Sequence, residues 1–277
     1  MQSCEFVKLI TNRIRRRIDP VFVMTIQASG KNSTERAVNA LPAPEEKAGY
    51  VQAMFDAIAP RYDLLNSVLS VRMHHGWRRV AADKAQLKSG GVALDICTGT
   101  GDLALELARR AGAKGLVIGS DFSAPMLQLG EKKKAQRSVP ALEFVLADAL
   151  KLPFPENAFD AVTVAFGIRN VADVEAGIRE MARVTTPDGK VVILEFNSPR
   201  NPVFAALYQW YSFNVLPRLG GLISGRRAAY NYLPSSVKAF YSREEIKEMM
   251  ERAGLKNVTI TDLTFGSVVV HRGVKSK

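Results

Sequence analysis

The sequence is poor in cysteine and contains no long apolar run. Cys4 and Cys97 are the only two cysteines among 277 residues, too few for a disulfide framework or a cysteine-rich zinc site. No uninterrupted apolar run reaches the roughly 18 residues that would suggest a membrane-spanning helix. We therefore expect a soluble, globular protein of a reducing, cytoplasmic compartment.

Acidic residues are absent from residues 197–243, although the whole chain has 27 Asp and Glu against 38 Lys and Arg. This stretch holds nine of the 22 aromatic residues and six basic ones, namely Arg200, Arg218, Arg226, Arg227, Lys238 and Arg243. Basic and amphipathic aromatic side chains suit a helix that lies on an anionic membrane surface. A lid helix over an apolar pocket is the alternative, and it explains the aromatics but not the missing acids.

Residues 1–45 differ in composition from the rest of the chain. A basic cluster comprises Arg13, Arg15, Arg16 and Arg17, and Gly, Ser, Asn and Pro are frequent after it. The segment lacks the apolar core of a secretory signal. We expect a basic, flexible tail, and both organelle targeting and a true start at Met24 are left open.

From residue 46 to residue 277, apolar runs of strand length alternate with helical patterns. The expected strands cover residues 92–96, 116–121, 142–147, 159–166, 190–196, 257–263 and 267–272. Helices between the early strands favour a parallel sheet, and the short turn at 264–266 favours an antiparallel end. This pattern predicts one α/β domain, a Rossmann-like doubly wound sheet of seven strands, mostly parallel, with an antiparallel C-terminal strand. Residues 197–241 form its helical, aromatic-rich insertion.

Local signals mark the ends of several elements. Ser123 and Asp173 can each cap a following helix, and Ser242 with Glu245 forms a capping box. Gly254 suits the end of the helix that begins there. Pro187-Asp-Gly189 is expected to turn the chain into the fifth strand.

A glycine loop, Gly99-Thr100-Gly101, follows the first expected strand. Doubly wound sheets bind nucleotides at this edge, and glycine lets a ligand approach the backbone closely. With Ala104 the spacing also satisfies a dinucleotide pattern. Asp121, at the end of the second strand, suits a ribose in either case.

Acidic residues at three strand ends distinguish a dinucleotide site from a site for an adenosine ligand without phosphates. Asp95, just before the glycine loop, would attract a bound cation or ammonium and repel a pyrophosphate. Asp148-Ala149 follows the third strand, where a carboxylate and a backbone N–H suit an adenine edge. The chain also ends in an apparent β-hairpin instead of a second nucleotide-binding half. These features favour S-adenosylmethionine, a cationic adenosine without phosphates.

The chain resembles a known family at these positions. Asp95, Gly99-Thr-Gly101, Asp121, Asp148-Ala149 and Phe159-Asp160 are similar to the class I S-adenosylmethionine-dependent methyltransferases. Four segments resemble the ubiquinone/menaquinone biosynthesis C-methyltransferases of the UbiE/MenG type, namely residues 55–63 with Asn66, 94–102, 166–171 and 230–236. The likeness covers residues 46–277, and Phe166-Gly-Ile-Arg-Asn-Val171 is its most specific part. It implies cofactor contacts at Thr100, Asp121, Asp148 and Ala149.

The resemblance implies C-methylation of a reduced isoprenoid quinone. Demethylmenaquinol is favoured over a polyprenyl-benzoquinol, because Ala165 stands where some ubiquinone-type members carry Ser. Losing a phenolic proton would activate the ring carbon, and Arg169 would stabilise the phenolate. Asn170 would orient the other hydroxyl, and Tyr62 or Asp63 would shuttle the proton or gate entry.

Structural alternatives accompany these roles. Arg169 could instead pair with Asp173, and Tyr62 could be part of the core. His74 is a further possible base, but the adjacent pair His74-His75 is not expected to face one ligand, so no metal is predicted.

Three rival functions stay open: methylation of RNA, methylation of another lipid-like acceptor, and a cofactor-binding scaffold without turnover. The segment after the fourth strand lacks the Asn/Asp-Pro-Pro-aromatic run of enzymes that methylate base nitrogens, so no nucleic-acid partner is predicted. We expect peripheral association with an anionic membrane, and leave a homo-oligomer open.

Overall fold

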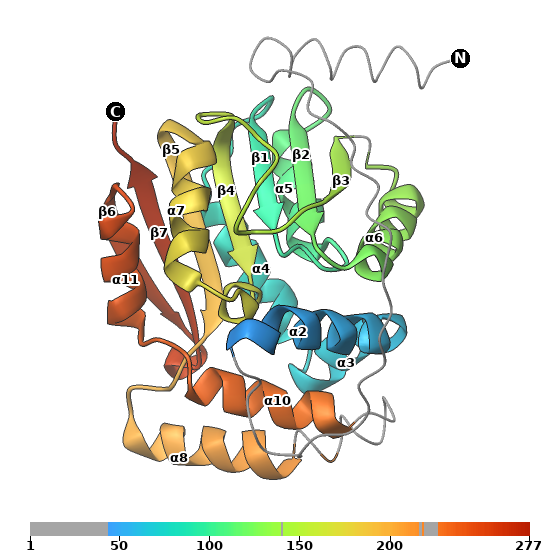
Figure 1. The fold of residues 1–277 in the computed structure, drawn as a ribbon, viewed down its shortest axis with the longest axis vertical. Helices are drawn as coiled ribbons and strands as arrows, with labels where there is room; N and C mark the ends of the chain where they lie inside the picture. The colour runs from blue at the N-terminus through green and yellow to red at the C-terminus, as the bar shows by residue number, and fades with distance from the viewer. Residues whose placement is uncertain (1–43, 140, 216–217, 219–226) are drawn as a thin grey trace.

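The computed structural model describes residues 44–139, 141–215, 218 and 227–277 (Figure 1). The predicted tail therefore lies almost wholly outside the described residues, and so does Arg226 of the insertion. The first described element is α2 (Pro44–Ile58), which begins two residues before the predicted start of the domain.

Seven strands form one sheet in the order β3-β2-β1-β4-β5-β7-β6. They are β1 (Val92–Ile96), β2 (Leu116–Asp121), β3 (Leu142–Leu146), β4 (Phe159–Ala165), β5 (Thr185–Phe196), β6 (Leu255–Leu263) and β7 (Val268–Lys275). The first five run parallel, and β7 is antiparallel to both β5 and β6. The predicted fold class is confirmed.

The predicted turn at Pro187–Gly189 lies within β5. Thr185 pairs with Phe159 and Lys190 with Ala161, so residues 186–189 form a bulge in the strand. Asp188 adopts a left-handed conformation there, with φ of 60°. A bulge lets the chain turn locally without leaving the sheet, which is why β5 begins five residues before the predicted boundary.

Helices cover both faces of the sheet. In Figure 1, α7 (Val174–Val184) and α11 (Arg243–Arg252) lie in front, whereas α4 (Met73–Lys84) and α5 (Asp102–Ala111) lie behind. A further helix, α6 (Ala124–Arg137), contacts β3 and β2. Side chains alternate along each strand, so Leu94 and Ile96 join the front core while Ala93 joins the rear one.

The predicted helix caps are present. Ser123 accepts a hydrogen bond from Met126 N, and Asp173 accepts one from Ala176 N. Ser242 and Glu245 form the reciprocal capping box of α11. Gly254 follows that helix with φ of +86°, which glycine adopts without steric cost.

A helical layer lies against the carboxyl ends of the parallel strands, at the lower edge of the sheet in Figure 1. It consists of α2, η1 (Ala59–Arg61), α3 (Tyr62–Leu69), α8 (Pro202–Trp210), η3 (Tyr211–Val215) and α10 (Arg227–Lys238). The Tyr211 hydroxyl donates to Leu69 O at 3.0 Å, and both side chains pack with Leu65 and Leu233. Distant parts of the sequence thus form one cover over the sheet edge. None of the described helices is long and apolar enough to cross a membrane.

Candidate active site

The glycine loop connects β1 to α5 in a conformation that requires glycine. Gly99 and Gly101 have φ of +56° and +81°, and a Cβ at Gly101 would lie 2.6 Å from the Phe144 ring. A Cβ at Gly99 would lie 3.8 Å from the Tyr62 ring. The loop therefore packs closely against β3 on one side, while Tyr62 of the helical layer faces it on another.

Asp121 ties this loop to the end of β2. Its Oδ2 accepts from Gly99 N at 2.8 Å and its Oδ1 from Ser123 N at 2.9 Å. Burial raises the pKa of the Asp121 carboxyl even though these backbone donors favour its charged form. Each carboxylate oxygen keeps a lone pair, so the group can still accept from ribose hydroxyls.

Asp95 is less accessible than predicted. It is 1% exposed, and its two oxygens accept from Thr98 Oγ1 at 2.6 Å and Thr163 Oγ1 at 2.7 Å. Burial raises its pKa to about 6, against the two hydroxyl hydrogen bonds. The described contacts make Asp95 a support for the start of the loop, and its direct contact with a cofactor ammonium stays a prediction.

Asp148 and Ala149 complete the row of strand ends. Asp148 is exposed and accepts from Leu150 N at 2.9 Å, whereas Ala149 is buried. Three carboxylates thus lie at or just beyond the carboxyl ends of the neighbouring strands β1, β2 and β3. This donor set fits a cationic adenosine group, because the buried acids supply acceptors and negative charge beside a glycine loop.

Asp63 and Thr100 belong to a polar cluster that joins α3 to the glycine loop. The Thr100 hydroxyl donates to Asp63 Oδ1 at 2.7 Å and accepts from Lys133 Nζ at 2.8 Å. Lys133 also pairs with Asp63 and Asp102, each at 2.7 Å. Both predicted side chains are therefore already engaged, and Asp63 holds α3 against the glycine loop. Nothing in the sequence distinguished Lys133 from its neighbours Lys132 and Lys134.

Tyr62 lies between this cluster and the cofactor loop. Its ring packs edge-on against Phe55 at 6.0 Å between centroids, and burial raises the pKa of its hydroxyl. Tyr62 is therefore a packing residue that also lies next to the glycine loop, and its role as a proton shuttle or gate stays a prediction.

Arg169 follows β4 in η2 (Ile168–Asn170) and is 7% exposed. Its Nη1 donates to Glu195 Oε1 at 2.6 Å and to Phe166 O at 2.7 Å. The predicted alternative partner, Asp173, instead caps α7. Glu195 is the penultimate residue of β5, and an acid inside the apolar run 191–196 is the sequence signal that could have predicted this pair.

Two features set Arg169 apart from an ordinary structural ion pair. Its Nε is buried and has no hydrogen-bond acceptor among the described residues, so one donor is left for a ligand. Its guanidinium carbon lies 5.5 Å from the centre of the Phe196 ring. Burial raises the pKa of the paired Glu195 carboxyl, while the Arg169 charge acts to lower it.

Asn170 connects the sheet edge to the insertion. Its Oδ1 accepts from the Tyr232 hydroxyl at 3.2 Å, and the Tyr232 ring lies 5.6 Å from Tyr50. Burial raises the pKa of Tyr232 and of Tyr208, with Arg169 acting to lower both. The two phenols therefore come from α10 and α8 to the vicinity of the arginine.

The two adjacent histidines converge, contrary to prediction. The rings of His74 and His75 lie 3.9 Å apart between centroids, and their nitrogens come within 4.8 Å of each other and of an Asp102 oxygen. However, Arg78 Nη1 lies 2.7 Å from His74 Nδ1, and Lys133 holds Asp102. Burial and Arg78 lower the pKa of His74 to about 4, which makes it a weak base.

The basic residues of the insertion do not all face solvent. Arg243 is 4% exposed and pairs with Asp262. Arg200 pairs with Asp262 at 3.0 Å and with Glu244 at 3.3 Å. Arg243 is therefore unavailable to an anionic surface, whereas the Arg200 side chain stays 62% exposed. Contact of the insertion with such a surface stays a prediction.

The fold and the three-acid site define an S-adenosylmethionine-dependent methyltransferase. The chain belongs to the ubiE/COQ5 methyltransferase family, whose model matches residues 43–275. It is 47% identical over 234 residues to the ubiquinone/menaquinone biosynthesis C-methyltransferase UbiE of Citrifermentans bemidjiense, covering 84% of this chain and 99% of that protein. It is 51% identical over 221 residues to the demethylmenaquinone methyltransferase of Thermus thermophilus, covering 79% and 99%.

Solved structures agree with the fold. The [4+2]-cyclase SpnF aligns with a TM-score of 0.61 at 18% identity, over 83% of this chain and 97% of that one. A SAM-dependent methyltransferase from Aquifex aeolicus aligns with a TM-score of 0.51 at 17% identity, over 84% and 98%. The predicted family and cofactor are thus confirmed.

Proposed function

We propose that this protein methylates a ring carbon of a reduced isoprenoid quinone, and that its preferred acceptor is demethylmenaquinol. The unpartnered, buried Nε of Arg169 beside the cofactor edge carries the assignment, because it offers a cationic donor to a quinol oxygen. The names of the relatives support quinone chemistry. Ala165, at the end of β4, supports the naphthoquinol head.

Arg169 would act by stabilising the quinolate. Loss of one quinol hydroxyl proton to solvent raises electron density on the neighbouring ring carbon. S-adenosylmethionine, when bound, would supply the methyl group and leave as S-adenosylhomocysteine, and the ring carbon would lose its own proton to restore the aromatic quinol. A permanent guanidinium charge in a buried site stabilises the anionic oxygen far more than water would. Glu195 and Phe166 O hold Nη1, which leaves Nε for the substrate.

Neighbouring groups would orient the ring and exclude water. Asn170 can donate its amide N–H to the second oxygen while its Oδ1 accepts from Tyr232. Tyr208 and Tyr62 would enclose the head group, and Tyr62 gates the cofactor side. A closed, dry site aligns the two reactants and strengthens the electrostatic contribution of Arg169.

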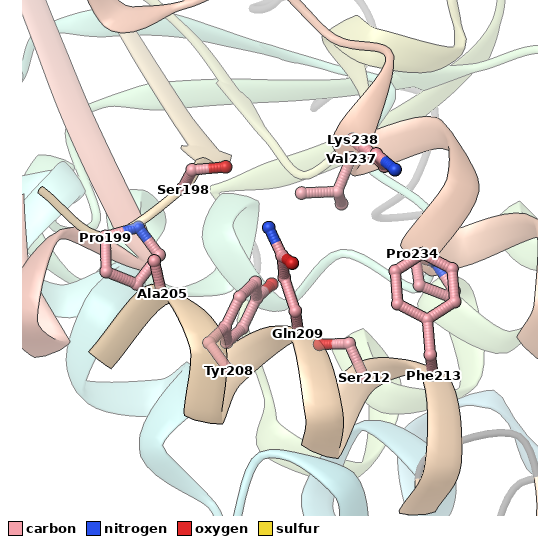
Figure 2. Close-up of a pocket in the computed structure, with 10 residues that line it drawn as sticks. All are labelled: Ser198, Pro199, Ala205, Tyr208, Gln209, Ser212, Phe213, Pro234, Val237 and Lys238. Carbon is pink, nitrogen blue, oxygen red and sulfur yellow. The ribbon is translucent and has the colours of Figure 1, made fainter. Parts of the chain in front are cut away.

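Entry of the quinol requires α8 and α10 to separate. Figure 2 shows Tyr208 and Gln209 of α8 and Ser212 of η3 pointing toward the segment that carries Pro234 and Val237. The cavity between them measures about 30 Å³, room for about one water molecule. A quinol ring is much larger, so this helix pair would act as a lid.

The outer face of the helical layer would rest on the membrane. All but one of the large apolar side chains that are exposed among the described residues lie in this layer, in the segments beside it or at the sheet edge it covers. The exception is Met73, the first residue of α4. On α8 the exposed apolar side chains include Val203, Leu207 and Trp210, which are 75%, 59% and 59% exposed. Such a concentration marks an interaction surface, and a bilayer holds the isoprenoid tail.

Methyl transfer from labelled S-adenosylmethionine to reduced short-chain quinols tests the proposed activity. Wild type should label demethylmenaquinol faster than a benzoquinol of equal tail length. Arg169→Ala should lower kcat on the order of 10²–10³-fold, as for the loss of one oxyanion donor. Arg179→Ala, on the exposed surface of α7, is the matched control and should keep the wild-type rate.

The outcomes separate the alternatives. Preference for the benzoquinol would move the assignment to ubiquinone-type chemistry. An unchanged rate in Arg169→Ala would leave the function and reject the mechanism. No label in any quinol, despite cofactor binding, would refute the proposed activity.

For membrane docking, Leu207→Ser with Trp210→Ser should lower binding to vesicles and leave turnover of a short-chain quinol unchanged. Both side chains are exposed, so folding should not suffer. Wild-type vesicle binding in the double variant would refute docking through α8.

A further inference from the structure

A basic cleft lies behind the sheet, between α4, α5 and the end of α6. It has a volume of about 500 Å³ and shares none of the residues predicted to bind the cofactor. Five arginines line it: Arg72, Arg78, Arg79, Arg109 and Arg137. They come from three separate segments of the chain, and the fold alone brings them together.

The acids in the cleft are already paired with other cations. Glu106 accepts from Arg109 at 2.7 Å and from Arg110 at 2.6 Å. Asp102 pairs with Lys133 at 2.7 Å. Arg72, Arg79 and Arg137 have no carboxylate partner within the described part of the chain, so the cleft keeps a net positive charge.

The histidine beside these arginines responds to that charge. Partial burial holds the pKa of His75 below its ordinary value, against the opposing effect of Asp102, and the charges of Arg78, Arg72 and Arg137 lower it further. Three guanidinium groups from two helices and a connecting turn therefore act on one imidazole. The same charges oppose a metal ion at the His74, His75 and Asp102 cluster.

Exposed apolar side chains form the rim of the cleft. Val71 and Met73, on either side of Arg72, are 76% and 45% exposed. Val71 and Arg72 both adopt left-handed conformations, with φ of 48° and 61°, which costs free energy for a β-branched residue. Leu69 O, just before this turn, accepts from the Tyr211 hydroxyl of η3, so the turn is held against the insertion.

We propose that this cleft binds the phosphate of an anionic phospholipid head group, with Val71 and Met73 inserted at the level of the acyl chains. Guanidinium groups match phosphate oxygens in charge and fork geometry, and unpaired arginines next to exposed apolar residues suit a bilayer surface. The inference rests on the membrane docking proposed above and adds a second, lipid-selective contact to it. A nucleic acid also carries phosphates but gives no reason for the apolar rim.

Vesicle co-sedimentation of the full-length protein tests the proposal. The variant Arg72→Gln/Arg79→Gln/Arg137→Gln removes three exposed charges from the cleft. Each arginine near an anionic surface contributes about 1 kcal/mol, so binding to phosphatidylglycerol-containing vesicles should fall on the order of a hundredfold. Binding to pure phosphatidylcholine vesicles should change little.

The matched control, Arg179→Gln/Lys247→Gln/Arg252→Gln, removes the same net charge from the front helices α7 and α11. It should bind both vesicles nearly as wild type does. If the control loses as much binding to the anionic vesicles as the cleft variant does, the attraction depends only on the net charge of the protein. The cleft would then not be a lipid-binding site.

Two competition arms identify the source of the phosphate. In the first arm, inorganic phosphate is added at constant ionic strength. If it displaces the wild-type protein from the vesicles but has no effect on the cleft variant, the ligand of the cleft is free phosphate and not a lipid. Cleft-dependent binding of single-stranded RNA stronger than that of anionic vesicles would replace the lipid with a nucleic acid. If the wild-type protein binds none of the vesicles, the membrane docking itself is refuted. If it binds neutral and anionic vesicles equally well, only the cleft proposal is refuted.

Discussion

The buried pair of Arg169 and Glu195 permits a double-mutant test that separates structure from chemistry. Arg169→Met removes the cation, Glu195→Gln removes the carboxylate charge while keeping an oxygen for Phe196 N, and the double variant removes both charges. Their side chains are 6% and 4% exposed, so each single change leaves an almost fully buried charge without its partner. Breaking such a pair costs about 3–5 kcal/mol of unfolding free energy.

The double variant should recover most of that loss. Only the contacts of Arg169 with Phe166 O and the Phe196 ring stay missing, which together cost about 1–3 kcal/mol. The interaction energy of the cycle should therefore be about 3 kcal/mol or more. Urea unfolding gives the free energies, and each single variant should also melt roughly 6–12 °C below wild type.

Methyl transfer by the same four proteins then decides the role of Arg169. If Arg169 stabilises the quinolate, the double variant should fold nearly as wild type does yet stay as slow as Arg169→Met. Recovery of rate together with stability would make the arginine a structural partner only. Additive losses in stability, with no interaction energy, would refute the ion-pair reasoning itself.

Three further changes test the cofactor side. Asp121→Ala should weaken S-adenosylmethionine binding on the order of a hundredfold by calorimetry, since it removes the clamp on Gly99 N as well as the ribose acceptor. Lys133→Ala should cost about 2 kcal/mol and raise amide hydrogen exchange in α3, because it removes contacts to Asp63 and Asp102. The pKa of Asp95 is raised from 3.8 to about 6, so its contribution to stability is lost as pH rises between these values. In wild type, the free energy of unfolding should therefore fall by up to about 3 kcal/mol over this pH range, and Asp95→Asn should remove this pH dependence. Urea unfolding below and above this pH range measures the difference.

Local patterns predicted the sheet and the cofactor loop well. The bounds of β1 and β2 match to the residue, because short apolar runs there end at polar or glycine positions. The acids after β1, β2 and β3 were found because parallel strands bring their carboxyl ends to one edge. Each of these signals lies within a few neighbouring residues.

Partners distant in sequence were not predicted. Glu195 lies 26 residues from Arg169, whereas the nearer Asp173 looked like the obvious counter-charge. The Asp173 carboxylate instead accepts from Ala176 N and caps α7, so it does not pair with Arg169. The cleft arginines are scattered over three segments, and only the packing of α4 against α5 shows that they share one surface.

The two faces of α8 explain why the insertion contains no acid. On its inner side, Tyr208 lies near Arg169 and Glu195, so a carboxylate there would compete with Glu195 for the arginine that we propose binds the quinolate. On its outer side, Leu207 and Trp210 are exposed, and a carboxylate beside them would be repelled by an anionic surface. Both requirements exclude the same residue types for different reasons. If the helices close the site and touch the membrane as proposed, their polar groups should be hydroxyls, amides and cations, and the sequences of α8 and α10 contain these and no carboxylate.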